Sequence, residues 1–438
     1  MRVLIVFFIS KVDNLNSFMV ATIIIASITF VLVTLSILFF PHIHFKRFRL
    51  DTYWIIALLG AVILLIARLA PIEEVGNQLI SNTSINPLKI LVLFFSMTTI
   101  SVILDELGLF RFLASVASSK AKENQHVLFL LLYILTSILT VFTSNDVVIL
   151  TFTPFICFFA KRSKINPIPY LVAEFVAANT WSLMLLIGNP TNIYLATSSG
   201  ITFIDYFRVM AVPTLVGGIV ELGLLFLIFN KSLKQPIQSN DLIYHFDDKI
   251  PVIVGLIDLF GCLIFLILSS YLNLEMWLIS LGFAVVFVVF VFVYSIFKKS
   301  NIVHIKETFV RLPYQLIPFF LSMFVIVVAL NVQGISEQLS NILGSTNTIW
   351  IYGYSSFLTC NLINNIPMSI LFSNLTSSLS GTTYLQAVYA SIIGSNIGAF
   401  LTPIGALAGI MFSSLVGKNN IRFTFIDFIK SKGVYFVS

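Results

Sequence analysis

The chain is a series of long apolar segments separated by short polar ones, and four apolar segments are interrupted in their interior. Segments long enough to cross a bilayer, about 20 residues each, lie near 19–40, 52–72, 87–104, 168–198, 209–230, 251–271, 276–297, 314–331 and 384–417. The paired halves 127–142 and 147–160, and 348–362 and 366–377, are each short for a crossing. The pattern predicts an all-α polytopic membrane protein with two re-entrant helical hairpins, 127–160 and 348–377, and two broken helices, 168–198 and 384–417.

Polar residues with glycine or proline mark each interruption. The two hairpins break at Thr143-Ser144-Asn145-Asp146 and at Asn364-Asn365-Ile366-Pro367. The broken helices are interrupted at Gly188-Asn189-Pro190-Thr191-Asn192 and at Gly394-Ser395-Asn396, which leads to Thr402-Pro403. Unwound backbone in hydrocarbon is tolerated only where protein covers it or where it lines a cavity. Breaks paired in this way are typical of the substrate site of a secondary transporter.

Composition narrows the class of protein. Hydrophobic residues make up 58% of the chain and charged residues only 10%, with a mean hydropathy of +1.01, whereas soluble domains carry about 25% charged residues. The net charge of +6 comes from loops and does not indicate nucleic-acid binding. Three isolated cysteines, scattered histidines and no nucleophile, phosphate-loop or metal-ligand set predict that the chain is not an enzyme. We expect no cofactor beyond a coupling ion.

The distribution of basic residues predicts the topology. If both short pairs are re-entrant, most of the 25 lysines and arginines fall in one set of loops. The other set holds only Arg2, Lys11 and Arg208, with Arg68 and Lys89 at span ends. By the positive-inside rule the basic loops are cytoplasmic. Hairpin 127–160 then enters from the cytoplasm and hairpin 348–377 from outside, in a multi-pass protein of the inner (plasma) membrane with a cytoplasmic C-terminus.

Weak self-similarity predicts an inverted repeat. Met97 and Gly108 are separated from Met323 and Gly334 by the same number of residues, and the stretch Phe203–Phe207 recurs as Phe425–Ile429. An odd number of crossings between equivalent elements inverts the repeats. We therefore divide the chain into an N-terminal extension (1–18), repeat 1 (19–230), a cytoplasmic linker (231–250) and repeat 2 (251–438).

The residues at the breaks suit a site for ions. Helix N-termini favour anions, and amide and hydroxyl oxygens can ligate Na⁺. Two half-sites are predicted: Ser144, Asn145, Asp146, Gly188, Asn189, Thr191 and Asn192; and Asn364, Asn365, Pro367, Gly394, Ser395, Asn396, Thr402 and Pro403. Ser144, Asn145, Asn365 and Asn396 are the candidate Na⁺ ligands. Such residues also pack helices in membranes, but their symmetric placement beside glycine or proline favours a site.

Carboxylates inside spans are costly and often functional. Asp146 at the first hairpin tip and Glu174 in the following helix are the candidates for proton or ion coupling. We expect Glu221 and Asp258 to make interhelical contacts. Asp105 and Glu106 are expected to be solvated at the cytoplasmic face.

At these motifs the sequence resembles the ion transporter superfamily. The stretches that carry the resemblance are LFFSMTTISVILDELGLFRFLA, TSNDVVILTFTPFI, IGNPTNIYLA, NNIPMSILFSNL and GSNIGAFLTPIGALAGIMF. Asn145-Asp146 resembles the arsenite permease and sodium–proton antiporter branch, whereas Gly188–Asn192 is nearer to the citrate and divalent-anion:sodium symporters. The resemblance implies paired re-entrant hairpins, a site at the bilayer midplane, elevator-type movement and homodimers.

Two functions follow from this site. The first is a secondary active transporter, embedded in the lipid bilayer, that moves a small anion (a carboxylate or an inorganic oxyanion) with Na⁺ or H⁺. The alternative is an arsenite efflux permease or a Na⁺/H⁺ antiporter. Asp146 and Glu174 favour the alternative, and the amide-rich site without a basic residue favours the anion transporter.

Overall fold

The computed structural model is helical throughout, apart from one short β-hairpin. It describes residues 16–40, 42–45, 48–81, 86–235, 237, 244, 246, 248–298, 303–402, 405–419 and 421. Helices that are long and apolar enough to cross a membrane number seven among these residues: Ser17–Ile37, Pro87–Glu106, Gln125–Phe142, Phe203–Phe229, Ile250–Leu272, Met276–Phe297 and Lys306–Val332. Exposed valines along α13, such as Val286 at 64%, are suited to lipid contact. The chain is a multi-pass membrane protein.

The first half of the chain holds these elements in order. They are α2 (Ser17–Phe39), β1 (His42–Phe45), β2 (Phe48–Asp51), α3 (Thr52–Ile66), α4 (Ile72–Ile80), α5 (Pro87–Glu106), α6 (Leu109–Ala121), α7 (Gln125–Phe142), α8 (Asn145–Ser163), α9 (Ile168–Trp181), η2 (Leu186–Gly188), α10 (Pro190–Ser198) and α11 (Phe203–Phe229). The antiparallel strands β1 and β2 were not predicted. Thr52 closes the hairpin by donating to the Phe40 carbonyl, 2.6 Å away.

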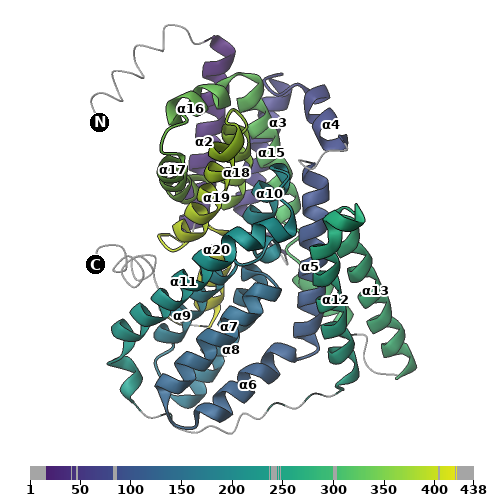
Figure 1. The fold of residues 1–438 in the computed structure, drawn as a ribbon, viewed down its shortest axis with the longest axis vertical. Coiled ribbons are helices and arrows are strands. Elements are labelled where there is room, and N and C mark those ends of the chain that lie inside the picture. The colour runs from purple at the N-terminus through teal and green to yellow at the C-terminus, as the bar shows by residue number, and fades with distance from the viewer. Residues whose placement is uncertain are drawn as a thin grey trace.

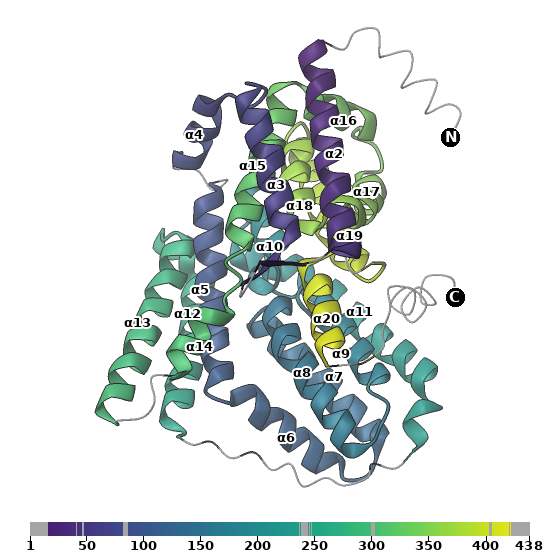
Figure 2. The same ribbon diagram turned by 180° about the vertical axis from the view of Figure 1, so that it is seen from behind.

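The second half of the chain is also mainly helical. Its elements are η3 (Ser232–Lys234), α12 (Ile250–Leu272), α13 (Met276–Phe297), α14 (Val303–Arg311), α15 (Leu316–Val332), α16 (Ile335–Leu343), α17 (Thr348–Ile363), α18 (Asn365–Thr376), α19 (Gly381–Gly398) and α20 (Leu407–Lys418). Helix α17 packs along α19, and α7 packs along α9. Figures 1 and 2 show α7–α9 in the lower half of the molecule and α17–α19 in the upper half.

The helix breaks lie close to their predicted places, with one exception. Helix α7 ends at Phe142 and α8 begins at Asn145, and only Asn364 separates α17 from α18. The predicted break at Gly394-Ser395-Asn396 is wrong, because these residues lie inside α19, which continues to Gly398. A Cβ on Gly394 would lie 2.1 Å from the Gly353 carbonyl oxygen. Gly394 therefore allows α17 and α19 to approach closely and does not open the helix.

Short helices follow two glycines in the left-handed region. Gly108 (φ 90°) precedes α6, and Gly334 (φ 72°) precedes α16. Residues with a Cβ rarely adopt this conformation, so the glycines allow the chain to turn sharply after α5 and after α15. The turn leads into α6 and α16, which connect these helices to α7 and α17.

The charged end of α5 differs from the prediction. Asp105 and Glu106 are buried, at 6% and 8% exposure, and are not solvated. Helix α14 lies against α5 and places the Arg311 guanidinium 2.6 Å from Asp105 and in contact with Glu106. An ion pair supplied by an amphipathic helix thus replaces water at this end.

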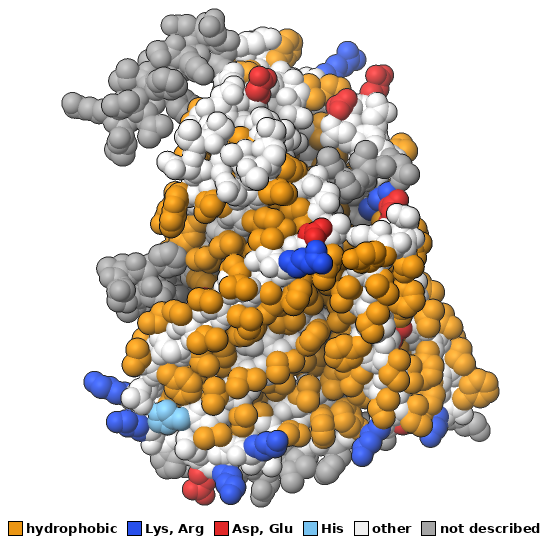
Figure 3. Space-filling view, in the orientation of Figure 1, with side chains coloured by type: hydrophobic (Ala, Val, Ile, Leu, Met, Phe, Trp, Pro, Cys, Tyr) orange, Lys and Arg blue, Asp and Glu red, His pale blue; other side chains and the backbone are white. Residues whose placement is uncertain are grey.

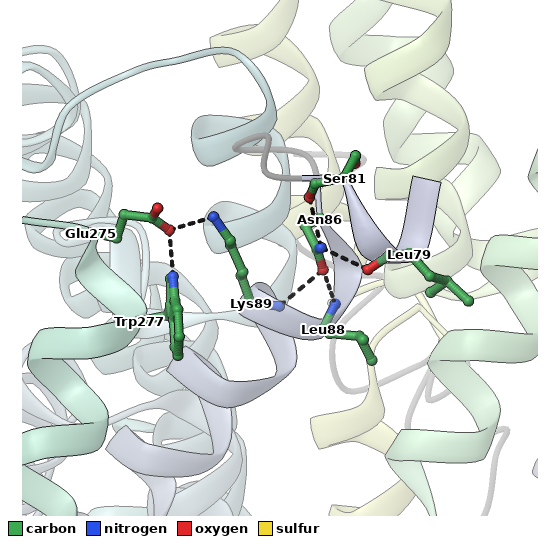
Figure 4. A network of polar contacts seen from close by, with 7 residues as sticks. All are labelled: Leu79, Ser81, Asn86, Leu88, Lys89, Glu275 and Trp277. Atoms are coloured by element: carbon green, nitrogen blue, oxygen red, sulfur yellow. Dashed lines mark hydrogen bonds and ion pairs between the residues drawn. The ribbon is translucent and has the colours of Figure 1, made fainter. Parts of the chain in front are cut away.

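The other end of α5 is fixed by a polar cluster (Figure 4). Asn86 caps the helix by accepting from the Leu88 and Lys89 amides at 2.8 and 3.3 Å. Lys89 forms a 2.5 Å ion pair with Glu275, which also accepts a hydrogen bond from the Trp277 indole. The cluster ties the start of α5 to the turn between α12 and α13.

Candidate functional site

Asn396 on α19 joins the two halves of the chain. Its Oδ1 accepts hydrogen bonds from Ser182 Oγ at 3.1 Å and from Asn189 Nδ2 at 3.2 Å. Its Nδ2 donates to Asn192 Oδ1 at 2.9 Å. All four side chains are buried, with at most 2% exposure. The break between α9 and α10 is therefore bonded directly to the second half of the chain.

The tip of the second hairpin joins the same network. Asn365 Nδ2 donates to Asn189 Oδ1 at 3.4 Å, and Thr191 Oγ1 donates to the Asn365 carbonyl at 3.3 Å. The preceding residue, Asn364, has φ 74° and caps α18 through its side chain, which accepts from the Ile366 amide. The positive φ turns the chain so that α18 begins in contact with α10.

The tip of the first hairpin reaches the network through α9. Asn145 Nδ2 donates to Asn179 Oδ1 at 3.3 Å. The single hydroxyl hydrogen of Ser182 is shared between the Asn179 carbonyl at 2.8 Å and Asn396 Oδ1 at 3.1 Å. Ser144 caps α8 by accepting from the Val147 amide at 3.4 Å. A continuous series of hydrogen bonds thus runs from Asn145 to Asn365. We call this series, with Asn192 and Thr191, the central amide network.

Local sequence explains the break between α9 and α10. Pro190 occupies the first turn of α10, and Asn189 caps that helix by accepting from the Thr191 amide at 2.9 Å. Asn192 Nδ2 donates to the Ser182 carbonyl at 2.9 Å. A Cβ on Gly188 would lie 2.2 Å from that same carbonyl oxygen. The loop thus folds back on itself, which requires glycine at this position.

Several buried oxygens at the site have no hydrogen-bond partner among the described residues. They are Asn145 Oδ1, Asp146 Oδ2, Asn365 Oδ1 and Ser395 Oγ. All four belong to residues predicted for the site. Leaving a buried oxygen without a hydrogen bond is costly, and oxygen atoms are the ligands that small hard cations such as Na⁺ prefer. One carboxylate and two amide oxygens are available here, so these residues fit a cation.

The other predicted residues have separate places. Glu174 accepts a 2.9 Å hydrogen bond from Thr153 of α8. Thr402 donates to Asn361 Oδ1 at 2.6 Å, and Asn361 in turn donates to the Gly398 carbonyl. This contact closes the break after α19. Pro367 lies in the first turn of α18. Pro403 and the repeated stretch Phe425–Ile429 lie outside the described residues.

Sequence reasoning missed two members of the central amide network. Asn179 and Ser182 connect the first hairpin tip to Asn396. Their signal was the polar run Asn179-Thr180-Trp181-Ser182, which interrupts an apolar span shortly before the predicted break. The helix already ends at Trp181, so the break is longer than Gly188–Asn192.

Comparison with known protein families shows which family the chain belongs to. Residues 50–383, most of the chain, match the citrate transporter family, CitMHS. The chain belongs to the citrate transporter family. This confirms the resemblance to the ion transporter superfamily seen in the motifs, and it identifies the chain as a membrane transport protein.

Curated relatives agree over most of their length. The arsenical pump membrane protein of Escherichia coli K12 is 26% identical over 350 residues, 75% of this chain and 78% of the relative. A putative arsenical pump membrane protein of Bacillus subtilis is 24% identical over 411 residues, 86% and 89% of the two chains. An uncharacterized transporter of Mycobacterium tuberculosis is 25% identical over 362 residues, 79% and 82%. The similarity to arsenite permeases is therefore also confirmed.

Proposed function

We propose that this member of the citrate transporter family is a secondary active transporter that moves a small anion together with Na⁺ or H⁺. One observation carries the proposal: both predicted half-sites meet in the central amide network, which is buried. Within the described part of the chain, no lysine, arginine or histidine bonds to it. Amide donors and the N-termini of α8, α10 and α18 would hold the anion.

Asp146 and the neighbouring oxygens would hold the coupling ion. An ionised carboxylate at this depth needs a cation or a proton. Asp146, Asn145 and Asn365 offer oxygens without a hydrogen-bond partner for Na⁺. Of the other predicted ligands, the Ser144 oxygen already accepts one hydrogen bond and the Asn396 oxygen two, so these would have to be released for a cation. A bound cation would also offset the charge of an anionic substrate. Binding of ion and substrate would in this way be coupled at one site.

The arrangement of the hairpins supports the inverted topology. The pair α7 and α8 and the pair α17 and α18 lie in opposite halves of the molecule (Figure 1), and their tips are bonded to one network. Gly108 and Gly334 occupy matching places before α6 and α16. In Figure 3 basic side chains gather along the lower edge, which favours a cytoplasmic side there. We infer an inner-membrane protein in which α6 and α16 act as arms for an elevator-type movement.

Arsenite efflux is the second candidate. It is favoured by the arsenical pump proteins among the relatives and by the carboxylate of Asp146 beside the first hairpin tip. An uncharged hydroxylated metalloid could form hydrogen bonds with the same amides without any basic residue. The two functions differ in whether the substrate carries a charge that a cation must offset.

A thermal-shift screen of the purified protein separates them. A ligand that binds only the folded state raises the melting temperature. At a ligand concentration of a hundred times Kd, the free energy of unfolding increases by about 2.7 kcal/mol. Citrate, succinate and sulfate should be tested with and without Na⁺, at two pH values, and arsenite in parallel. Stabilisation by an anion that depends on Na⁺ or pH supports the first function. Stabilisation by arsenite alone supports the second, and no stabilisation by any of them contradicts both.

A further inference from the structure

Glu221 on α11 is a carboxylate within a membrane-spanning helix that the central amide network does not include. Thr180 Oγ1 on α9 donates to its Oε2 at 2.5 Å. Thr180 itself is buried, at 5% exposure. Carboxylates at this depth are rare in membrane proteins and commonly take part in ion or proton movement.

The contact with Thr180 links Glu221 to the transport site. The residue before Thr180 is Asn179, whose side chain bonds to Asn145 at the first hairpin tip. Ser182, two residues after Thr180, bonds to Asn396. Helix α9 ends at Trp181, between these contacts. One short stretch of backbone therefore carries the partner of Glu221 and two members of the central amide network.

The groups around Glu221 offer it no counter-charge. Tyr133 of α7 donates to the Gly218 carbonyl at 2.7 Å and accepts from Trp181 Nε1 at 3.3 Å. The next titratable group on α7, His126, contacts Asn230 and Phe226 at the far end of α11. Helix α12 also packs on α11, and it carries the titratable groups Asp258, Cys262 and Tyr271. Helix α9, the third neighbour, carries Tyr170 and Glu174, so it too supplies no cation. Among the described residues no lysine, arginine or histidine forms an ion pair with Glu221.

We propose that Glu221 binds and releases a proton during the transport cycle and acts as a positioning residue for the first hairpin tip. This inference rests on the proposed function. Ionised Glu221 accepts the Thr180 hydrogen bond, and protonated Glu221 has a hydrogen to donate. Each cycle takes up one proton from water on one side and returns it on the other. The change at Thr180 alters the end of α9, and with it Asn179 and Asn145.

The test uses the full-length protein in vesicles, with initial transport rates measured over about pH 5 to 9, the range covered by buried carboxylates. Glu221→Gln should transport at a rate that no longer varies with pH, while the substrate still raises its melting temperature. Glu221→Asp should keep a pH dependence with a shifted midpoint. Thr180→Val, which removes the donor to the ionised form, should move the profile to higher pH. Asp258→Asn, which alters another intramembrane carboxylate, should behave like the wild type.

The outcomes separate this inference from the proposed function. A wild-type protein that transports none of the tested substrates contradicts the proposed function. A wild type that transports without any pH dependence overturns the role of Glu221. So does a folded Glu221→Gln variant with the wild-type profile, or loss of the pH dependence in Asp146→Asn alone. If Glu221→Gln does not fold, a Glu221→Asp profile identical to the wild type decides against the inference.

Discussion

An asparagine side chain accepts and donates hydrogen bonds in one plane, and Asn396 uses both capacities to hold together segments from both halves of the chain. Its oxygen serves Ser182 and Asn189, and its nitrogen serves Asn192. Loss of a partner leaves buried polar groups unsatisfied at about 1–3 kcal/mol each. Because the network is buried, water cannot easily replace the missing group.

Asn396→Ala should therefore abolish transport and lower the melting temperature. The reason is that Asn189 Nδ2 loses its acceptor and Asn192 Oδ1 loses its donor, while the Ser182 hydroxyl keeps the Asn179 carbonyl. With two buried groups left unsatisfied, we expect a loss on the order of 2–6 kcal/mol. Thermal unfolding in detergent and uptake into vesicles measure the two effects. Asn419→Ala, at an exposed asparagine that bonds to the Leu415 carbonyl, is the control. An Asn396→Ala variant with wild-type uptake would show that the central amide network is not required for transport.

Asn145→Ala and Asn365→Ala should each abolish transport while the protein remains folded. Each removes an oxygen that has no hydrogen-bond partner among the described residues, and with it a ligand for the coupling ion. Truncation should cost less stability than Asn396→Ala, because each amide makes a single, long hydrogen bond of 3.3 or 3.4 Å. Uptake assays paired with size-exclusion profiles make the measurement. Normal uptake by both variants would remove the hairpin tips from the site.

At the residue scale, the sequence predicts which polar residues lie at the breaks but not which of them bond. Asn189, Asn365 and Asn396 stand out because they are polar residues near glycine or proline inside apolar segments. Unwound backbone there is tolerated only where protein covers it or it lines a cavity. Asn179 was missed because it lies within a regular helix, where only the packing of α8 against α9 gives it a role. Hydrogen-bond partners about 200 residues apart depend on the tertiary fold, which local pattern does not contain.

At the scale of elements, glycine controls how closely α17 and α19 approach. Gly394→Ala should destabilise the protein by at least about 1–3 kcal/mol, because its Cβ would lie 2.1 Å from the backbone oxygen of Gly353. Gly282→Ala is the matched control, since a Cβ there meets nothing within 4 Å. Melting temperatures of the two variants decide the matter. Equal values would mean that α17 and α19 can separate freely.

The cluster at the start of α5 gives a pH-dependent prediction. The Lys89 ammonium, which bonds to the Glu275 carboxylate, lowers the pKa of that group below its ordinary 4.5, and the Trp277 indole adds to the effect. A lowered pKa stabilises the fold above the ordinary value, and this stabilisation is lost as the pH falls through the lowered pKa. Glu275→Gln should melt at a slightly lower temperature than the wild type at neutral pH. The loss in free energy of unfolding should be at most about 1 kcal/mol, because the pair is partly exposed.

Melting curves of both proteins as a function of pH test this expectation. The difference between them should shrink as the pH falls below 4.5. Glu337→Gln serves as the control, because Glu337 is a carboxylate in a different element, the first turn of α16. A difference that stays constant with pH would assign the effect to side-chain packing rather than to charge.

Element types could be predicted more reliably than element ends. Long apolar segments predicted α2, α5, α11, α12 and α13, because the thickness of the bilayer sets the length of a membrane-spanning helix. The break after α19 was misplaced because Gly394 was taken to open a helix, when it serves a close contact with α17. The β-hairpin at 42–51 was missed because its basic residues indicate a loop and its pairing depends on the ends of α2 and α3.

At the scale of the whole molecule, the topology predicts where the ends of the first hairpin lie. Lys122→Cys and Lys161→Cys, both at exposed positions, should react with a membrane-impermeant thiol reagent from the cytoplasmic side only. Background labelling should be low because Cys157, Cys262 and Cys360 are buried. Arg208→Cys, expected on the outer side, is the opposite control. Labelling of the two lysine positions from different sides would mean that residues 127–160 cross the membrane.

The central amide network can be completed only late in the synthesis of the chain. Asn189 and Asn192 meet their partner Asn396 only 207 and 204 residues later along the chain. At about 5–20 residues per second, a growing chain holds these amides in the bilayer for about 10–40 seconds before Asn396 is made. During that interval Asn189 Nδ2 and Asn192 Oδ1, the groups that bond to Asn396, have only water, the insertion machinery or one another as partners. A chain that stops before Asn396 would keep them exposed permanently, and quality-control proteases would have a ready means of recognising it.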